Sequence, residues 1–208
     1  MIAIVDYGVG NLASVRKAFA AVGARAELVD DPAGLRRAAA IVLPGVGNFG
    51  HCARELARAG FPAELRRARE RGVPILGICV GMQLLFEGSE EDRAEAGLGF
   101  YRGSIVRLTG VARVPQIGWN AVRTVGTHPW LRDVTSGDHF YFVHSYAATT
   151  AEDIVLGTVD YGGPRLAIVG SPGLLGVQFH PEKSGANGLR LLRAFATSDA
   201  AVAASGTR

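Results

Sequence analysis

Cys79 is one of two cysteines in the sequence, and its neighbours favour nucleophilic chemistry. It lies within a glycine-flanked segment, residues 77–81, after the apolar run 73–78 and before the helical pattern 82–86. A residue at such a tight strand-to-helix corner takes a strained backbone conformation, and glycines leave room for the turn. The corner presents the sulfur at the carboxyl edge of a sheet, near a helix N-terminus whose dipole favours thiolate. A buried structural cysteine in a glycine-rich turn is the alternative interpretation.

His180 is the histidine best placed to act as a base for that thiol. It follows another apolar run, residues 174–178, and is itself followed by Pro181 and Glu182. Residues two apart in an extended segment point to the same side, so Glu182 can hold the imidazole and stabilise the imidazolium. An ordinary surface turn is the alternative. We interpret the other histidines as satisfied polar groups: His51, His128, His139 and His144.

A glycine-rich loop, residues 44–49, supplies a third element of the predicted site. It follows the apolar run 40–43 and begins Pro-Gly-Val-Gly, so its backbone N–H groups can approach a ligand closely. We predict the N–H of Val80 as one oxyanion donor and an N–H near Gly45 or Val46 as the second. A plain strand-to-helix turn is the alternative for this loop.

The elements that must position these groups alternate regularly in the first half of the chain. Short apolar runs separated by helical segments predict buried parallel strands with right-handed crossovers, the doubly wound α/β class. Such sheets bind ligands beyond the carboxyl ends of their strands. The predicted strands are residues 2–5, 26–29, 40–43 and 73–78. The predicted helices are residues 12–22, 35–39 and 49–71.

The second half changes character, because short apolar runs there are separated by turns. They predict antiparallel additions to the sheet and a small second sheet. The predicted strands are residues 105–108, 121–124, 139–143, 154–159, 166–169 and 174–178. A closing helix is predicted over residues 186–196, and we expect one domain over residues 1–198 with a frayed tail at 199–208.

The bulk composition excludes several classes of function. With 208 residues, 48% apolar and 20% charged, the chain can bury a sizeable core. No apolar run is long enough to cross a bilayer and no leader precedes the first strand, so we expect a cytoplasmic protein. There is no Cys-x-x-Cys pair to suggest zinc. Nucleophilic chemistry at a cysteine needs no metal and no organic cofactor, so we expect neither. The net charge of +3 and the basic run 66–71, which lacks aromatics, favour a solvated helix face over nucleic-acid binding.

Taken together, these segments resemble the class I glutamine amidotransferases, whose Cys-His-Glu triad lies on a flavodoxin-like sheet. Within that class, the chain is similar to the glutaminase subunits of imidazole glycerol phosphate synthase. The resemblance runs through about residues 1–196 and shows no departure at the triad. The narrower match rests on residues 6–12, 44–49, 115–120 and 141–146.

The resemblance implies hydrolysis of glutamine and transfer of the ammonia to a (β/α)8-barrel synthase subunit of histidine biosynthesis. It assigns glutamine recognition to Gly47, Gln83, Ser145 and Tyr146. It assigns the partner interface to Asn11, Gln116, Trp119, Asn120, Tyr141 and Lys183. Solvent capping by Gln83, a core position for Trp119 and an ordinary solvated charge at Lys183 are the alternatives. One oxyanion donor contributes about 3 kcal/mol to catalysis, so a misplaced loop peptide would slow turnover. A partner that turns the glycine-rich loop into the correct orientation could therefore activate the enzyme.

Two other functions compete with this one. The first is the glutaminase of a different synthase, such as that of pyridoxal phosphate synthesis, or a free-standing cysteine hydrolase. The second is a non-catalytic regulatory subunit that keeps the fold. The Gly-Trp-Asn motif at 118–120 and the first-loop motif argue against the first, and the intact triad argues against the second.

Overall fold

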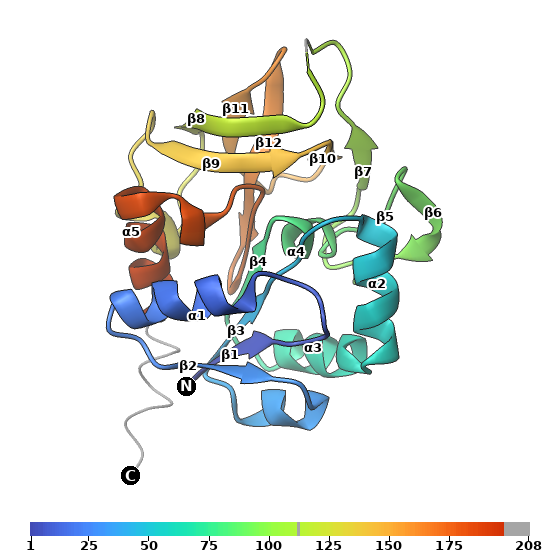
Figure 1. Cartoon of the computed structure of the whole chain (residues 1–208), viewed down its shortest axis with the longest axis vertical. Helices are drawn as coiled ribbons and strands as arrows, with labels where there is room; N and C mark the ends of the chain where they lie inside the picture. Colours follow the sequence, from blue (N-terminus) through green and yellow to red (C-terminus); the bar gives the residue numbers. More distant parts are fainter. Residues whose placement is uncertain (112, 198–208) are drawn as a thin grey trace.

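A nine-stranded mixed sheet forms the centre of the molecule, and a four-stranded sheet lies beside it (Figure 1). The computed structural model describes residues 1–111 and 113–197, so the predicted tail at 199–208 lies outside the described residues. The large sheet has the order β2 (Ala26–Val29), β1 (Ile2–Val5), β3 (Ala40–Leu43), β4 (Ile75–Ile78), β13 (Leu174–Val177), β12 (Pro164–Ser171), β11 (Val155–Asp160), β8 (Gln116–Thr124) and β9 (His139–His144).

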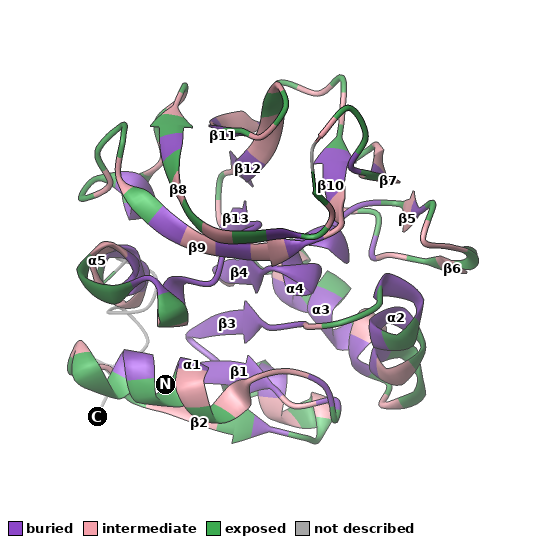
Figure 2. Ribbon diagram, turned by 45° about the horizontal axis from the view of Figure 1, so that its top comes forward, coloured by how far each residue is buried: buried purple, intermediate pink, exposed green. Residues whose placement is uncertain are grey.

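The two halves of this sheet differ in strand direction. From β2 through β13 each neighbouring pair is parallel, whereas from β13 to β9 each pair is antiparallel. Every residue of β1, β3, β4 and β13 is buried, which explains their continuous apolar runs (Figure 2). The predicted α/β class and its antiparallel additions are confirmed.

Helices cover both faces of the parallel strands. Helix α1 (Leu12–Ala21) packs against α5 (Gly185–Ala196), and α2 (Phe49–Arg58) packs against α3 (Phe61–Glu70). The chain passes from β1 to β2 through α1, but from β3 to β4 through α2 and α3 in the opposite direction along the sheet. Right-handed crossovers therefore put the two helix pairs on opposite faces (Figures 1 and 2).

Three predicted helices have different bounds in the structure. The segment predicted as one helix over 49–71 is two helices, because Gly60 takes φ +79° and the second helix begins at Phe61 with Pro62 in its first turn. The helix predicted at 35–39 is a 3-10 turn, η1 (Pro32–Arg37), whose first turn is capped by Asp31. The helix expected at 82–86 is the single turn α4 (Val80–Gln83).

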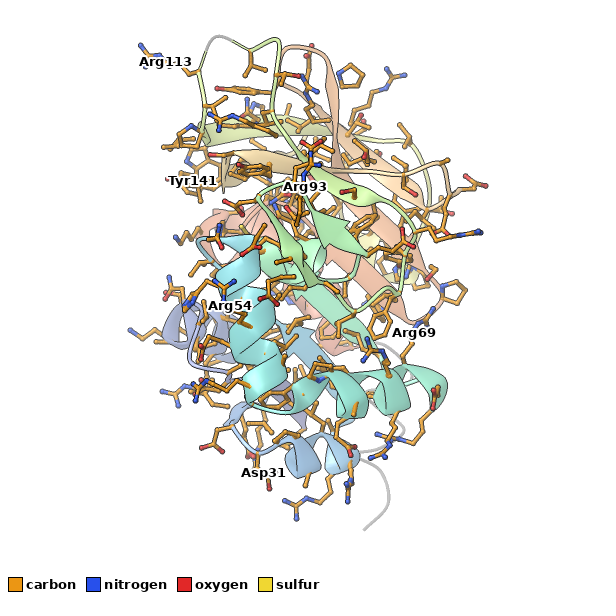
Figure 3. All side chains as sticks on the ribbon, turned by 90° about the vertical axis from the view of Figure 1, so that its right-hand side faces the viewer. Asp31, Arg54, Arg69, Arg93, Arg113 and Tyr141 are labelled. Carbon is orange, nitrogen blue, oxygen red and sulfur yellow. The ribbon has the colours of Figure 1, made fainter. Side chains whose placement is uncertain are left out.

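The smaller sheet contains strands that the sequence pattern did not predict. Its order is β10 (Tyr146–Thr149), β7 (Ser104–Arg107), β5 (Gly88–Ser89) and β6 (Asp92–Ala96). β5 has two residues and β6 is polar, so neither has an apolar pattern. Arg54 of α2 holds β6 through Asp92 and Glu95, at 2.8 and 3.3 Å (Figure 3). Two further 3-10 turns are η2 (Pro129–Leu131) and η3 (Pro181–Lys183).

The order of the central strands determines where chemistry can occur. β3, β4 and β13 are adjacent and parallel, so their carboxyl ends meet at one edge of the sheet. The glycine-rich loop, Cys79 and the segment before His180 each follow one of these strands. Within the described residues, no helix is long and apolar enough to span a membrane and no cluster of His, Cys, Asp or Glu side chains could hold a metal ion.

Candidate active site

A cavity of about 600 Å³ lies at this edge of the sheet. It brings together the predicted thiol, its predicted base, part of the glycine-rich loop and the segment after β9. Its lining residues are Gly10, Asn11, Val46, Gly47, Cys79, Val80, Gln83, Glu91, Pro115, Val143, His144, Ser145, Tyr146, His180 and Lys183. Most of the predicted catalytic and glutamine-binding residues therefore line one cavity.

Cys79 occupies the predicted strained corner between β4 and α4. Its backbone has φ +55° and ψ −114°, and it is the one non-glycine residue with positive φ in the described chain. Such a conformation costs about 1–3 kcal/mol and persists only where the surroundings enforce it. They do so here, because a Cβ on Gly81 would lie 1.9 Å from the Leu43 carbonyl oxygen and one on Gly77 would lie 2.8 Å from the Gly81 oxygen.

The predicted helix-dipole effect on Cys79 has little support in this structure. The helix that begins at Val80 has four residues, and a single turn carries only a small part of a macrodipole. The elbow itself is confirmed as the predicted strand-to-helix turn. Its electrostatic partner is a side chain, His180, rather than a helix end.

His180 and Glu182 are paired in a buried site. Nδ1 of His180 lies 2.7 Å from Oε1 of Glu182, and both side chains are almost fully buried. Residues 181–183 form the 3-10 turn η3, so the predicted extended segment is wrong. The turn, rather than strand alternation, brings the carboxylate under the ring.

The charge state of His180 reflects three competing influences. Burial disfavours its imidazolium, yet the side chains of Cys79 and Glu182 outweigh burial and raise the pKa of His180 to about 10. Among the described atoms, Nε2 of His180 and Oε2 of Glu182 have no hydrogen-bond partner. Buried polar atoms without partners are uncommon and are often functional. A protonated His180 whose Nε2 remains free suits a general acid at neutral pH.

The backbone of His180 is held from two sides. Ser184 Oγ donates to the His180 carbonyl at 2.6 Å and accepts from the Tyr141 N–H at 3.0 Å. The His180 N–H in turn donates to the Tyr141 carbonyl at 2.9 Å. This arrangement ties the base to β9, and Ser184 is a positioning residue that sequence reasoning missed.

The glycine-rich loop does not yet offer its second oxyanion donor. The Val80 N–H, the first predicted donor, points at the Gly45 carbonyl oxygen at 3.3 Å. The carbonyl of the Gly45–Val46 peptide thus faces the elbow, and the N–H of that trans peptide points the other way. Val46 and Val80 line the cavity, but the predicted two-donor oxyanion hole is not assembled in this conformation.

Buried amides support the floor of the cavity. Gln83 donates from Nε2 to the Tyr146 carbonyl and to Oε1 of Gln178, both at 3.1 Å. Gln178 Nε2 in turn lies 3.8 Å from the Cys79 sulfur. Solvent capping by Gln83 is therefore wrong, although its amide nitrogen is already engaged within the protein. Gln178 was missed, but it is two residues before His180 and the strand alternation applied to that segment could have found it.

His144 is a second buried histidine beside the same cavity, as the interpretation of a satisfied polar group requires. Its Nδ1 lies 2.8 Å from the Tyr146 carbonyl oxygen and its Nε2 lies 2.9 Å from the Gln116 side-chain amide. Burial lowers the pKa of His144 to about 4, so this ring is neutral at physiological pH.

Exposed aromatic and apolar side chains gather on β8 and β9 next to the cavity. Trp119 is 53% exposed, which excludes a core position, and Ile117 on the same face of β8 is 62% exposed. The Trp119 and Tyr141 rings lie 6.2 Å apart, and Lys183 Nζ lies 6.0 Å from the Tyr141 ring. Figure 3 places Tyr141 on this part of the molecule. Ile117 was missed, although its alternation with Trp119 is visible in the sequence.

One residue predicted for the partner interface does not lie on the surface. Gln116 is fully buried and donates from Nε2 to Oδ1 of Asn120 at 2.9 Å. The prediction that its side chain contacts a partner is wrong, because the register of β8 turns it inward. Asn120 and Asn11 remain partly exposed, and Asn11 lines the cavity.

Comparison with known proteins decides the family. The model of the family described as glutamine amidotransferase class-I matches residues 3–198 of this chain. The chain belongs to the class I glutamine amidotransferases. This confirms the resemblance predicted from the elbow and triad segments, and it identifies the chain as a glutamine amidotransferase.

Two relatives of this amidotransferase carry the same name, and each matches this chain over nearly its whole length. A Thermococcus kodakarensis protein named imidazole glycerol phosphate synthase subunit HisH is 48% identical, covering 94% of this chain and 98% of the relative. A protein of the same name from Moorella thermoacetica is 45% identical, covering 93% of each chain. The resemblance to this subfamily is therefore confirmed at the level of sequence similarity.

Solved structures support the amidotransferase fold. One described as a glutamine amidotransferase matches with a TM-score of 0.75 at 20% identity, covering 94% of this chain and 97% of the other. PurLQS from Thermotoga maritima matches with a TM-score of 0.73 at 22% identity, covering 93% and 96%. At these identities the likeness concerns the fold alone.

Proposed function

We propose that this amidotransferase hydrolyses glutamine with Cys79 as nucleophile, His180 as acid and base, and Glu182 as the group that orients His180. The observation that carries the proposal is the strained Cys79 elbow in the same cavity as a His180–Glu182 pair joined at 2.7 Å. A thiol, an imidazole and a buried carboxylate in this order form the arrangement used for nucleophilic attack on amides.

The reaction proceeds in two halves. The Cys79 thiolate attacks the γ-carboxamide carbon of glutamine, and the carbonyl oxygen becomes an oxyanion. His180 then gives its Nε2 proton to the departing nitrogen, so ammonia leaves and a glutamyl thioester remains. In the second half, His180 accepts a proton from water, whose oxygen attacks the thioester. Glutamate is released, and the thiolate and imidazolium are restored.

Glutamine is recognised by groups around the rim of the cavity. Gly47, Ser145 and Tyr146 line it on the sides of the glycine-rich loop and the β9–β10 connection. We assign the α-amino and α-carboxylate groups to these residues and to Gln83. The assignment of Gln83 implies that its existing bonds to Tyr146 and Gln178 rearrange or that its oxygen makes the contact.

The enzyme is slow until the glycine-rich loop turns. The Gly45 carbonyl oxygen occupies the Val80 N–H, so a developing oxyanion would meet a second oxygen rather than two donors. Turning the Gly45–Val46 peptide would free Val80 and present the Val46 N–H. Removal of one such donor costs about 3 kcal/mol, or roughly a hundredfold or more in rate.

A (β/α)8-barrel synthase subunit receives the ammonia and induces this turn. The shared name of the relatives supports this partner. The exposed Ile117, Trp119 and Tyr141 cluster beside the cavity supports a docking face there. We include Asn11, Asn120 and Lys183 in that face. The synthase would convert its phosphoribulosyl-formimino aminoimidazole-carboxamide nucleotide to imidazole glycerol phosphate and aminoimidazole-carboxamide ribotide in the cytoplasm.

An isotope experiment tests this function. The complex with the synthase subunit is given its nucleotide substrate and glutamine labelled with 15N in the side-chain amide, while unlabelled ammonia is present in the buffer. We expect the label in the imidazole product, because the ammonia passes directly between the sites. A product that carries mainly unlabelled nitrogen would contradict transfer between subunits, and a complex that consumes no glutamine would overturn the glutaminase.

A further inference from the structure

Three successive carbonyl groups of the glycine-rich loop are held by three different groups. Tyr7 donates from its hydroxyl to the Pro44 carbonyl at 2.8 Å. The Val80 N–H donates to the Gly45 carbonyl at 3.3 Å, and Cys52 donates from Sγ to the Val46 carbonyl at 3.3 Å. Each of the three peptides that follow Pro44 is therefore oriented by its own hydrogen bond.

The two outer bonds originate from rigid and buried parts of the fold. Tyr7 follows the buried strand β1 and is itself buried. Cys52 is fully buried on α2, one turn after the start of that helix. That start is fixed by two hydrogen bonds: Glu91, outside the loop, accepts from the Phe49 N–H at 2.7 Å, and Asn48, near the end of the loop, accepts from the His51 N–H at 2.9 Å.

The middle peptide has the least support of the three. The 3.3 Å bond from Val80 is long for an N–H to oxygen bond, and no side chain donates to the Gly45 oxygen in the described part of the chain. A peptide plane can rotate through the ψ of the residue before it and the φ of the residue after it. Turning the Gly45–Val46 plane therefore leaves the Pro44 and Val46 carbonyls in place.

We propose that Tyr7 and Cys52 are positioning residues that anchor the two peptides flanking Gly45–Val46 and confine the activating turn to that single peptide. This inference rests on the proposed glutaminase function and its gated oxyanion hole. With both anchors present, the loop has two discrete arrangements that differ in one peptide plane. Without either anchor, the neighbouring peptide can rotate as well, and the Val46 N–H reaches the oxyanion position in a smaller fraction of molecules.

For Tyr7→Phe the expected signature is a loss in kcat without a change in KM for glutamine, because the oxyanion forms only after glutamine has bound and Tyr7 holds the Pro44 carbonyl rather than a group assigned to glutamine binding. Cys52 holds the peptide that carries the Gly47 N–H, so its variants are judged by kcat alone. In the complex with the synthase subunit and its nucleotide, we expect Tyr7→Phe to lower kcat about tenfold. Cys52→Ala should lower it about fivefold, because a thiol is a weaker donor than a hydroxyl.

Cys52→Ser is the matched variant that separates anchoring from packing. It keeps a donor at the same position, so it should retain at least about half of the parent kcat. Alkylation of Cys79 by iodoacetamide, followed by mass spectrometry of its peptide, supplies a second readout. That displacement builds no oxyanion, so its rate should match the parent in Tyr7→Phe and in both Cys52 variants. Thermal unfolding of each variant measures any loss of fold.

The outcomes separate this inference from the function on which it rests. If the parent complex hydrolyses glutamine and both Tyr7→Phe and Cys52→Ala keep its kcat, the anchoring role is overturned while the glutaminase stands. If kcat falls equally in Cys52→Ala and Cys52→Ser, or falls together with Cys79 alkylation, the cause is general packing and the inference is wrong. If the parent complex does not hydrolyse glutamine, the proposed function fails and this inference fails with it.

Discussion

The elbow after β4 and the glycine-rich loop after β3 face each other across one sheet edge, but they are built differently. At the elbow, a Cβ on Gly77 or Gly81 would collide with backbone atoms, and Cys79 is locked at φ +55°. In the loop, a Cβ on Gly45 would lie 2.7 Å from the Gly81 nitrogen, but one on Gly47 would meet nothing within 4 Å, and the Gly45 carbonyl is held by one 3.3 Å bond. The proposed nucleophile is preassembled, whereas its proposed oxyanion hole is not.

This difference suggests how a glutaminase avoids wasting glutamine. The proposed nucleophile, Cys79, lies in a strained and buried conformation, and such conformations persist only where the surrounding structure enforces them. The element that can change is the Gly45–Val46 peptide, whose carbonyl is held by a single long hydrogen bond. Control of the reaction can therefore reside in the loop while the triad remains unchanged.

The largest effect is expected from removing the nucleophile at the elbow. Cys79→Ala should lower glutamate release by about 10⁴-fold or more, in the absence and in the presence of the synthase subunit. The fold should persist, because the smaller side chain fits the corner. Glutamate release and thermal unfolding of the variant provide the measurements, with Cys52→Ser, which should keep at least about half of the parent kcat, as the control for loss of a buried thiol. Activity near the parent level in Cys79→Ala would contradict the assignment of Cys79 as the nucleophile.

The rigidity of the elbow can be tested through its glycines. In Gly81→Ala the new methyl would lie 1.9 Å from the Leu43 carbonyl oxygen, so the free energy of unfolding should fall by about 3 kcal/mol. Gly72→Ala is the control for backbone strain in open space, because Gly72, unlike Gly81, has a positive φ, +73°, and nothing lies within 4 Å of an added Cβ. Its cost should be about 1–2 kcal/mol from the backbone alone. Denaturant unfolding compares the two, and equal losses would show that the elbow is not tightly packed.

The base can be weakened without moving the elbow. Glu182→Gln removes one of the two groups that raise the pKa of His180, so that pKa should fall from about 10 toward its ordinary value near 6.5. The raised pKa stabilises the fold fully below about pH 6.5, and this contribution disappears as the pH rises toward 10. NMR titration of labelled histidines measures the shift, with His144 near 4 as an internal reference. We expect turnover to fall about a hundredfold at pH 7.

A result of the opposite sign would be informative for that variant. If the pKa of His180 rose or stayed near 10 in Glu182→Gln, the carboxylate would not be the group that supports the imidazolium. The Cys79 side chain would then carry that role alone.

The smallest effect is expected at the proposed docking face for the synthase subunit. Trp119→Ala should weaken binding of the synthase subunit by about 2 kcal/mol, or roughly thirtyfold in Kd, because large exposed aromatics dominate interface energetics. Leu28→Ala is the control, since Leu28 is an exposed apolar residue on β2 at the opposite region of the sheet. Calorimetric titration measures both. Equal affinities of the parent and Trp119→Ala for the synthase subunit would show that the subunit does not bind at this face.

The positions of the proposed nucleophile and base could be predicted from the sequence, whereas the loop conformation that would control them could not. Cys79 and His180 could be predicted because each follows a short apolar strand, and parallel strands end at one edge. The contact of Glu182 was predicted for the wrong reason, since a 3-10 turn makes it. The orientation of the Gly45 carbonyl could not be predicted, because glycine permits either peptide orientation at small cost.

Two features depend on contacts between residues that are distant in the sequence. One is the direction of the side chains on β8, and the other is the anchoring of the glycine-rich loop by Tyr7 and Cys52. Gln116 was expected at the surface, but strand pairing with β9 begins at that residue and turns its side chain inward. Tyr7 reaches the Pro44 carbonyl across 37 residues of chain. No local pattern encodes such a contact, and only the assembled sheet reveals it.

One measurement tests the central claim that the nucleophile is preassembled while the oxyanion hole awaits a partner. Glutamate release from glutamine is measured for the purified chain alone, with the synthase subunit, and with the synthase subunit and its nucleotide ligand. We predict slow release by the chain alone and an increase of about a hundredfold or more in kcat in the full mixture. Equally rapid hydrolysis by the isolated chain would contradict the gated loop.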